Sequence, residues 1–193
     1  MKIFISSTFE DLKEEREKLH KSLNKAGFES LGMEFFVAES NSQKEVCLRE
    51  VQNANLVLLI VTDKYGTVDE KTQKSYTHLE FDKAKKAGIE TLAFLYKDPT
   101  DQNVKKFQDE VKASGITVDF FENNSDISSV LYPALFNYVI TKGLIPNKTK
   151  TFNDFTQFYA RSFQEDSLFN YNQKLIGRTN ELALLDTDRK SVV

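Results

Sequence analysis

The sequence predicts an open α/β fold in which helices cover both faces of a five-stranded parallel sheet. Three observations indicate this class. Short apolar segments alternate with amphipathic segments from residue 3 to residue 141, as expected of repeated β-α-β units. The segment 56–61, Leu-Val-Leu-Leu-Ile-Val, is continuously apolar, which is typical of a central strand buried on both faces. The connections are short, which favours one doubly wound sheet with the flavodoxin-like strand order 2-1-3-4-5.

Each strand is predicted from a short apolar run, and each helix from apolar residues that recur every three or four positions. The predicted strands are, in chain order, 3–5, 31–37, 56–61, 91–96 and 116–121. The predicted helices are 12–26, 43–53, 75–87, 100–113 and 127–141. Gly27 and Gly88 follow the last apolar positions of the first and third helices, where glycine commonly ends a helix.

Composition excludes several classes of protein. The chain has 193 residues, of which 40% are hydrophobic, enough for one sizeable core and an extension. A net charge of −3 offers no basic surface, so no nucleic-acid partner is predicted. The sequence contains neither a membrane-length apolar run nor a secretory signal, so we expect a cytoplasmic protein without membrane contact. The single cysteine, Cys47, excludes an intrachain disulfide and predicts a small buried residue in the second helix.

The first strand ends in three hydroxyl residues, Ser6, Ser7 and Thr8, and Phe9 follows them before the first helix. Ligands of open α/β sheets bind at the carboxyl ends of strands, and helix N-termini attract anions. A phosphate or a carboxylate is therefore the expected ligand beside these residues. Ser7 or Thr8 is also expected to cap the first helix.

Glu80 is the carboxylate whose position most strongly indicates chemistry. Helical spacing places it with Tyr76 and Ala84 on the face of the helix 75–87 that is expected to pack on the sheet. This helix follows the third strand, so Glu80 is expected to face the same crevice as the hydroxyls of the first strand. The alternative is a capping box, in which Glu80 bonds to the backbone of Thr77.

No metal site is predicted. The chain has only two histidines, His20 and His78, too few for a three-histidine zinc site. No cluster of histidine, cysteine and carboxylate residues stands at ligand spacing, and neither a phosphate-binding glycine loop nor a nucleophile elbow occurs. His20 is expected on a solvated helix face. The sequence therefore predicts neither a metal nor a prosthetic group.

Four short motifs stand in order along the predicted domain, and a charged segment follows the first of them. The motifs are FISSTF at 4–9, GME at 32–34, DKYG at 63–66 and SYTHLE at 75–80. The charged segment contains Asp11, Leu12, Glu14, Glu15 and Arg16. In this order the motifs resemble the TIR-like domain of unknown function 4062 family. The resemblance covers residues 2–141 and implies the same flavodoxin-like fold.

The resemblance also implies an activity. TIR domains that cleave NAD carry a catalytic glutamate in the equivalent helix, a few residues after an aromatic residue, and Glu80 after Tyr76 is similar. It implies that the Glu80 carboxylate holds the ribose and stabilises the oxocarbenium-like charge as nicotinamide leaves. The implied contacts of NAD are Ser6, Ser7, Thr8, Phe9, Tyr65, Ser75 and Tyr76. NAD is a substrate in this interpretation.

The chain changes character after Pro146. We divide it into a TIR-like domain at 1–145, an aromatic-rich linker helix at 146–175 and a last segment at 176–193. Residues 175–182, LIGRTNEL, resemble the entry to STAND and NACHT ATPase modules, so we expect such a module, truncated here, as the C-terminal partner. The final residues look like translated sequencing adapter, and a natural charged tail is the alternative.

Two functions of different classes stay open. In the first, the domain is an NAD-cleaving effector of a STAND-type ATPase, activated by self-association, in anti-phage defence or signalling. In the second, it is a non-catalytic TIR-like module that transmits assembly through homotypic contacts. A third option is a domain of the same shape that modifies nucleosides or nucleotide sugars.

Overall fold

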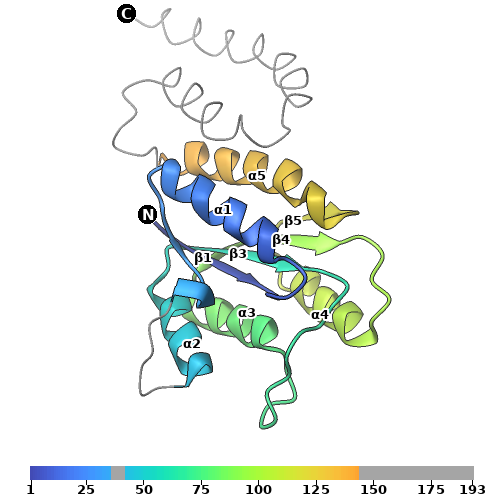
Figure 1. Ribbon diagram of the computed structural model, residues 1–193. Helices are drawn as coiled ribbons and strands as arrows, with labels where there is room; N and C mark the ends of the chain where they lie inside the picture. Colours follow the sequence, from blue (N-terminus) through green and yellow to red (C-terminus); the bar gives the residue numbers. More distant parts are fainter. Residues whose placement is uncertain (36–41, 144–193) are drawn as a thin grey trace, which may run out of the picture. The chain divides into compact units, whose positions relative to one another are not determined.

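The computed structural model describes residues 1–35 and 42–143 (Figure 1). The elements are β1 (Lys2–Ser7), α1 (Lys13–Lys25), β2 (Glu29–Leu31), the 3₁₀ helix η1 (Met33–Phe35), α2 (Gln43–Asn53), β3 (Leu56–Val61), α3 (Tyr76–Ala87), β4 (Glu90–Tyr96), α4 (Gln102–Ala113), β5 (Val118–Phe121), the 3₁₀ helix η2 (Asn124–Asp126) and α5 (Ile127–Thr141). Within these residues, none of the helices has the length and apolar character needed to cross a membrane. The predicted linker helix at 146–175 and the segment 176–193 lie outside the described residues.

All five strands form one parallel sheet in the order β2-β1-β3-β4-β5. The predicted fold class and strand order are therefore confirmed. Figure 1 shows α1 and α5 on one face of the sheet and α2, α3 and α4 on the other. The strand order reverses between β1 and β3, and ligands of open α/β sheets bind at such a switch point.

The core lies on both sides of β3, in which every residue is buried. This burial explains the continuous apolar run at 56–61, because a central strand meets water on neither face. Between the sheet and α4, the Phe107 side chain is 1% exposed, and burial of such a ring contributes about 2–3 kcal/mol. On the same face of the sheet, between β1, α2 and α3, Cys47 packs in a second cluster that contains Phe4 and Val57. The expectation that Cys47 is buried is confirmed.

The ends of α3 are set by Ser75 and Gly88. Ser75 is the N-cap, and its Oγ accepts a hydrogen bond from the backbone N–H of His78 at 3.2 Å. Gly88 ends the helix in the left-handed conformation, with φ of 68°, which favours glycine. Because Ser75 caps the helix, the alternative of a capping box between Thr77 and Glu80 is wrong.

The second strand differs most from its prediction. β2 begins two residues before the predicted strand 31–37 and contains only three residues. Gly32 follows it, and the chain then forms η1. A short edge strand exposes few unpaired backbone groups, which limits pairing with other chains. The remaining residues of the predicted strand lie outside the described part.

Candidate active site

Glu80 lies where α3 meets the end of β1. Its side chain is 7% exposed, and its Oε2 accepts a hydrogen bond from Ser6 Oγ at 2.6 Å. The thiol of Cys47, on α2, is a further group that influences the ionisation of this carboxyl. The helical spacing that predicted a sheet-facing Glu80 therefore placed this side chain correctly, and the structure brings it together with Ser6.

The surroundings of Glu80 tune its ionisation. Burial raises the pKa of the Glu80 carboxyl to about 7, because the charged form loses its hydration. The hydrogen bond from Ser6, the Arg16 guanidinium and the contact with Cys47 act in the opposite direction, whereas the charge of Glu34 adds to the increase. A carboxyl with this pKa exchanges protons readily near neutral pH, as a general acid or base requires.

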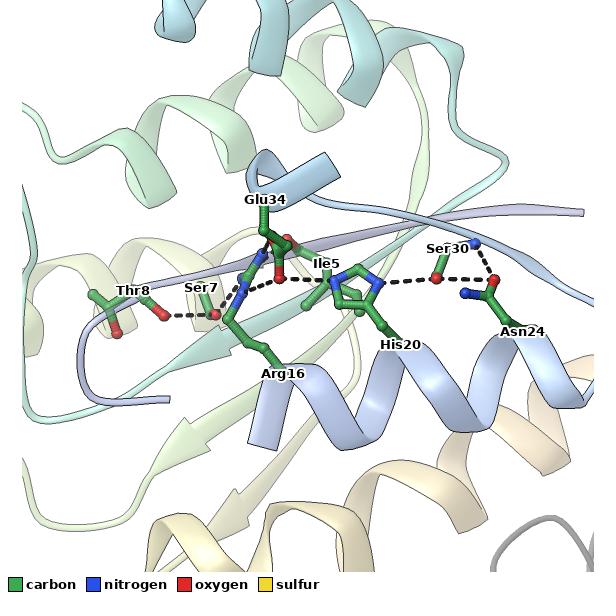
Figure 2. A network of polar contacts seen from close by, with 8 residues as sticks. All are labelled: Ile5, Ser7, Thr8, Arg16, His20, Asn24, Ser30 and Glu34. Atoms are coloured by element: carbon green, nitrogen blue, oxygen red, sulfur yellow. Dashed lines mark hydrogen bonds and ion pairs between the residues drawn. The ribbon is translucent and has the colours of Figure 1, made fainter. Parts of the chain in front are cut away.

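A buried arginine organises the other face of β1 (Figure 2). Arg16, on α1, is 2% exposed and donates from Nε and Nη2 to the two carboxylate oxygens of Glu34, at 3.0 and 2.6 Å. Its Nη1 donates to Ser7 Oγ at 2.7 Å and to the carbonyl oxygen of Ile5 at 3.3 Å. Such a two-point pairing fixes both side chains in orientation as well as distance. It ties η1 to α1 and to the end of β1.

His20 belongs to the same network, so the prediction that it is solvated is wrong. The ring is 2% exposed, with Nδ1 2.9 Å from Ser30 Oγ and Nε2 3.0 Å from Glu34 Oε1. Figure 2 shows the ring between these two side chains. Burial opposes ionisation of Glu34, but the adjacent His20 ring and the hydrogen bonds from Arg16 outweigh it and lower the Glu34 pKa to about 2. Helical spacing alone gives no sign that β2 and η1 cover this face of α1.

Gly32 lies in close contact with this network. A Cβ at this position would lie 2.6 Å from Glu34 Oε2, 2.8 Å from His20 Nε2 and 2.9 Å from Arg16 Nη2. At these distances a side chain at position 32 would require the ends of the three neighbouring side chains to move. The GME motif is thus explained by packing: the glycine admits the three charged or polar groups, and the glutamate pairs with the arginine.

The hydroxyl residues after Ser6 do not gather around Glu80. Ser7 Oγ accepts from Arg16 and donates to the carbonyl oxygen of Thr8 at 2.9 Å, and it does not cap α1, whose N-terminus has no side-chain cap. Thr8 Oγ1 lies 3.4 Å from Thr62 Oγ1. The carbonyl oxygen of Phe9 accepts the backbone N–H of Leu12 at 3.2 Å. The predicted capping by Ser7 or Thr8 is therefore wrong.

The predicted phosphate contact at the start of α1 stays a prediction, and the charges of the loop oppose it. Glu14 and Glu15 occupy the first turn of the helix, and Glu10 and Asp11 precede it. These carboxylates repel an anion, whereas the helix dipole attracts one.

The other predicted NAD contacts make different interactions or face solvent, and they are Tyr65, Ser75 and Tyr76. The Tyr65 hydroxyl is 2.8 Å from His78 Nδ1, and Tyr65 lines a small hollow together with Thr8 and Thr77. Ser75 is 1% exposed and caps α3, whereas Tyr76 is 37% exposed. The structure thus brings Ser6 together with Glu80, and separately Thr8 with Tyr65. Their assignment as NAD contacts stays a prediction.

The structure brings together a group of potential metal ligands that the sequence analysis did not anticipate. His78 and Asp82 of α3 and Glu110 of α4 offer one ligand atom each, all within 4.8 Å of one another. Sequence spacing could not reveal this group, because Glu110 is 32 residues from His78 and α4 alone brings it there.

Fold and site together define a flavodoxin-like α/β domain with a buried, titratable carboxyl at its topological switch point. The chain belongs to the family described as Domain of unknown function (DUF4062), whose model matches residues 2–135. The resemblance identified from the four motifs is therefore confirmed for this family. No curated protein matches the chain.

Solved structures that are similar to the chain include two enzymes. One is a 2-deoxyribosyltransferase from the psychrotolerant bacterium Bacillus psychrosaccharolyticus, with 17% identity, coverage of 70% of this chain and 96% of that chain, and a TM-score of 0.44. The other is the Clostridium botulinum CMP N-glycosidase BcmB, with 13% identity, coverage of 72% and 99%, and a TM-score of 0.47. These identities and scores are too low to transfer an activity to this chain.

Proposed function

We propose that this domain hydrolyses the N-glycosidic bond of a nucleotide, with NAD as the substrate and Glu80 as the catalytic group. One observation carries the proposal: a buried carboxyl, hydrogen-bonded to Ser6, stands at the carboxyl end of β1 beside the switch point of the sheet. Ligands of such sheets bind there, and a carboxylate held in a water-poor site interacts strongly with developing positive charge.

The chemistry requires only one carboxylate if the base leaves as a neutral molecule. In NAD, the C1′–N bond breaks and its electron pair returns to the pyridinium nitrogen, so nicotinamide leaves without taking a proton. The ionised Glu80 stabilises the positive charge on the ribose, water attacks C1′, and the proton of that water passes to the carboxylate or to solvent. Glu34, with a pKa of about 2, cannot supply a proton to a leaving group. The site therefore suits a nucleotide with a cationic base.

The burial of Glu80 favours an enzyme whose activity is regulated. With 7% exposure, the carboxylate contacts a nucleotide only after neighbouring side chains move. Activation by self-association, as the N-terminal effector of a STAND-type ATPase in defence or signalling, would supply that opening. We include this arrangement in the proposal.

The test is nicotinamide release from NAD by the full chain, at high concentration and after fusion to an oligomerising partner. Glu80→Gln keeps the size of the side chain and should reduce release by at least ~100-fold. Glu17→Gln, which alters an α1 side chain that is 65% exposed, is the matched control and should retain the activity.

Failure of every oligomerised form to release nicotinamide would reject the proposal. Concentration-dependent self-association, measured by sedimentation and unchanged in Glu80→Gln, would then favour the non-catalytic interaction module.

A further inference from the structure

A second polar cluster lies between α3 and α4, and its chemistry is independent of Glu80. We propose that His78, Asp82 and Glu110 form a binding site for a divalent transition-metal ion, specifically Zn²⁺. When the metal is absent, the Lys74 ammonium occupies this site. The donors are one imidazole nitrogen and two carboxylate oxygens. Zn²⁺ accepts this combination, whereas Mg²⁺ and Ca²⁺ prefer oxygen donors only.

The distances fit a tetrahedral ion. Donor atoms about 2.0–2.2 Å from Zn²⁺ lie about 3.3 Å from one another in a tetrahedral site. His78 Nε2 is 2.9 Å from Glu110 Oε2 and 3.9 Å from Asp82 Oδ1, so these two spacings lie on either side of that value, and all three donor atoms lie within 4.8 Å of one another. His78 and Asp82 are four residues apart on α3, which places them on one side of the helix. Three protein donors leave the fourth position open to water.

The imidazole is held as metal-binding histidines are held. His78 is 3% exposed, and its ring stacks on Phe107 with 4.2 Å between centroids. Its Nδ1 is 2.8 Å from the Tyr65 hydroxyl. In the tautomer that donates from Nδ1 to Tyr65, the lone pair of Nε2 points into the cluster. Such a partner on the remote ring nitrogen usually orients a histidine ligand.

Lys74 already occupies the place of a cation. Its Nζ is 2.9 Å from His78 Nε2, 2.7 Å from Asp82 Oδ2 and 3.7 Å from Glu110 Oε2. One ammonium balances one of the two carboxylate charges, whereas a Zn²⁺ ion balances both. The Lys74 side chain is 34% exposed, so it can turn outward into water when the metal enters.

The test is a calorimetric titration of the full chain with Zn²⁺. A titration with Mg²⁺ is the comparison, and Co²⁺ serves as a spectroscopic probe. The wild type should bind one Zn²⁺ and give the absorption bands of tetrahedral Co²⁺. Background binding should be low, because the chain has only two histidines and one cysteine.

Three variants make the test specific. Glu110→Gln removes one ligand and should weaken Zn²⁺ binding at least ~10-fold. Lys74→Met removes the competing ammonium and should strengthen it by a similar factor. Asp109→Asn alters a neighbouring carboxylate that is 77% exposed and should leave the affinity unchanged, with circular dichroism to verify that each variant is folded.

Absence of saturable Zn²⁺ binding by the wild type would overturn the proposal, even if Lys74→Met binds the ion. Equal affinity of Glu110→Gln and the wild type would overturn it as well. Neither result bears on nucleotide cleavage, because the titration contains no nucleotide.

Discussion

Replacement of Glu80 by glutamine should change the pH dependence of stability, because only the glutamate titrates. The pKa of Glu80 is about 7 in the folded protein and 4.5 ordinarily. At about 1.4 kcal/mol for each pKa unit, this difference corresponds to about 3 kcal/mol. Folding raises this pKa, so the protonated form favours the native state. The contribution is therefore complete below pH 4.5 and is lost as the pH rises through 7.

Urea unfolding at pH 4.5, 6 and 8.5 measures this effect. The free energy of unfolding of the wild type, relative to Glu80→Gln, should fall by about 3 kcal/mol across that range. Glu34→Gln is the control with the opposite sign. The pKa of Glu34 is lowered to about 2, so its stabilisation is present above pH 4.5 and is lost as the pH falls through 2. Its difference from the wild type should therefore stay nearly constant between pH 6 and 8.5.

Parallel stability curves for the wild type and Glu80→Gln would refute this reasoning. They would mean that the carboxylate keeps its hydration in the folded protein. In that case Glu80 has no unusual proton affinity, and the physical basis of the proposed catalytic role is lost.

Two further predictions concern the surroundings of the site. Gly32→Ala should lower the free energy of unfolding by about 1–3 kcal/mol, because the methyl group would meet Glu34, His20 and Arg16. Urea unfolding measures the loss. An unchanged free energy of unfolding would contradict the prediction and mean that the three side chains move aside at little cost. Cys47 should resist a thiol-specific disulfide reagent at pH 8 in the folded protein and react in urea, because burial raises its pKa to about 12. Equally fast labelling of the folded and the urea-unfolded protein would contradict the burial of this thiol.

The fold class could be predicted from local sequence patterns, and the bounds of an element were predicted best where its pattern was clearest. The uninterrupted run of β3 and the periodic residues of α2 and α5 predicted those elements with the bounds observed, 56–61, 43–53 and 127–141. The second strand was predicted from the apolar residues 31–37, yet β2 is Glu29–Leu31. Its pairing with β1 at Lys2 to Phe4 sets its position, and that constraint is not local.

The part of the candidate site that lies on a single helix, α3, could be predicted from the sequence. Periodicity in α3 directed Glu80 to the sheet, where it meets Ser6. The partnership of Arg16 with Glu34, and that of His78 with Glu110, join residues from separate elements. Polar side chains that are distant in sequence give no signal of mutual contact, so these pairs required the three-dimensional arrangement.

The two buried ionisable side chains of helix α3, His78 and Glu80, point in nearly opposite directions. His78 and Glu80 are two residues apart and therefore about 200° apart around the helix axis. His78 contacts Tyr65 and Glu110, whereas Glu80 contacts Ser6. Rotation of α3 in either sense would lengthen hydrogen bonds on both sides at once. These contacts therefore fix the angular setting of the helix, which apolar packing alone leaves loose, and any substitution that rolls α3 on the sheet disturbs both polar groups together.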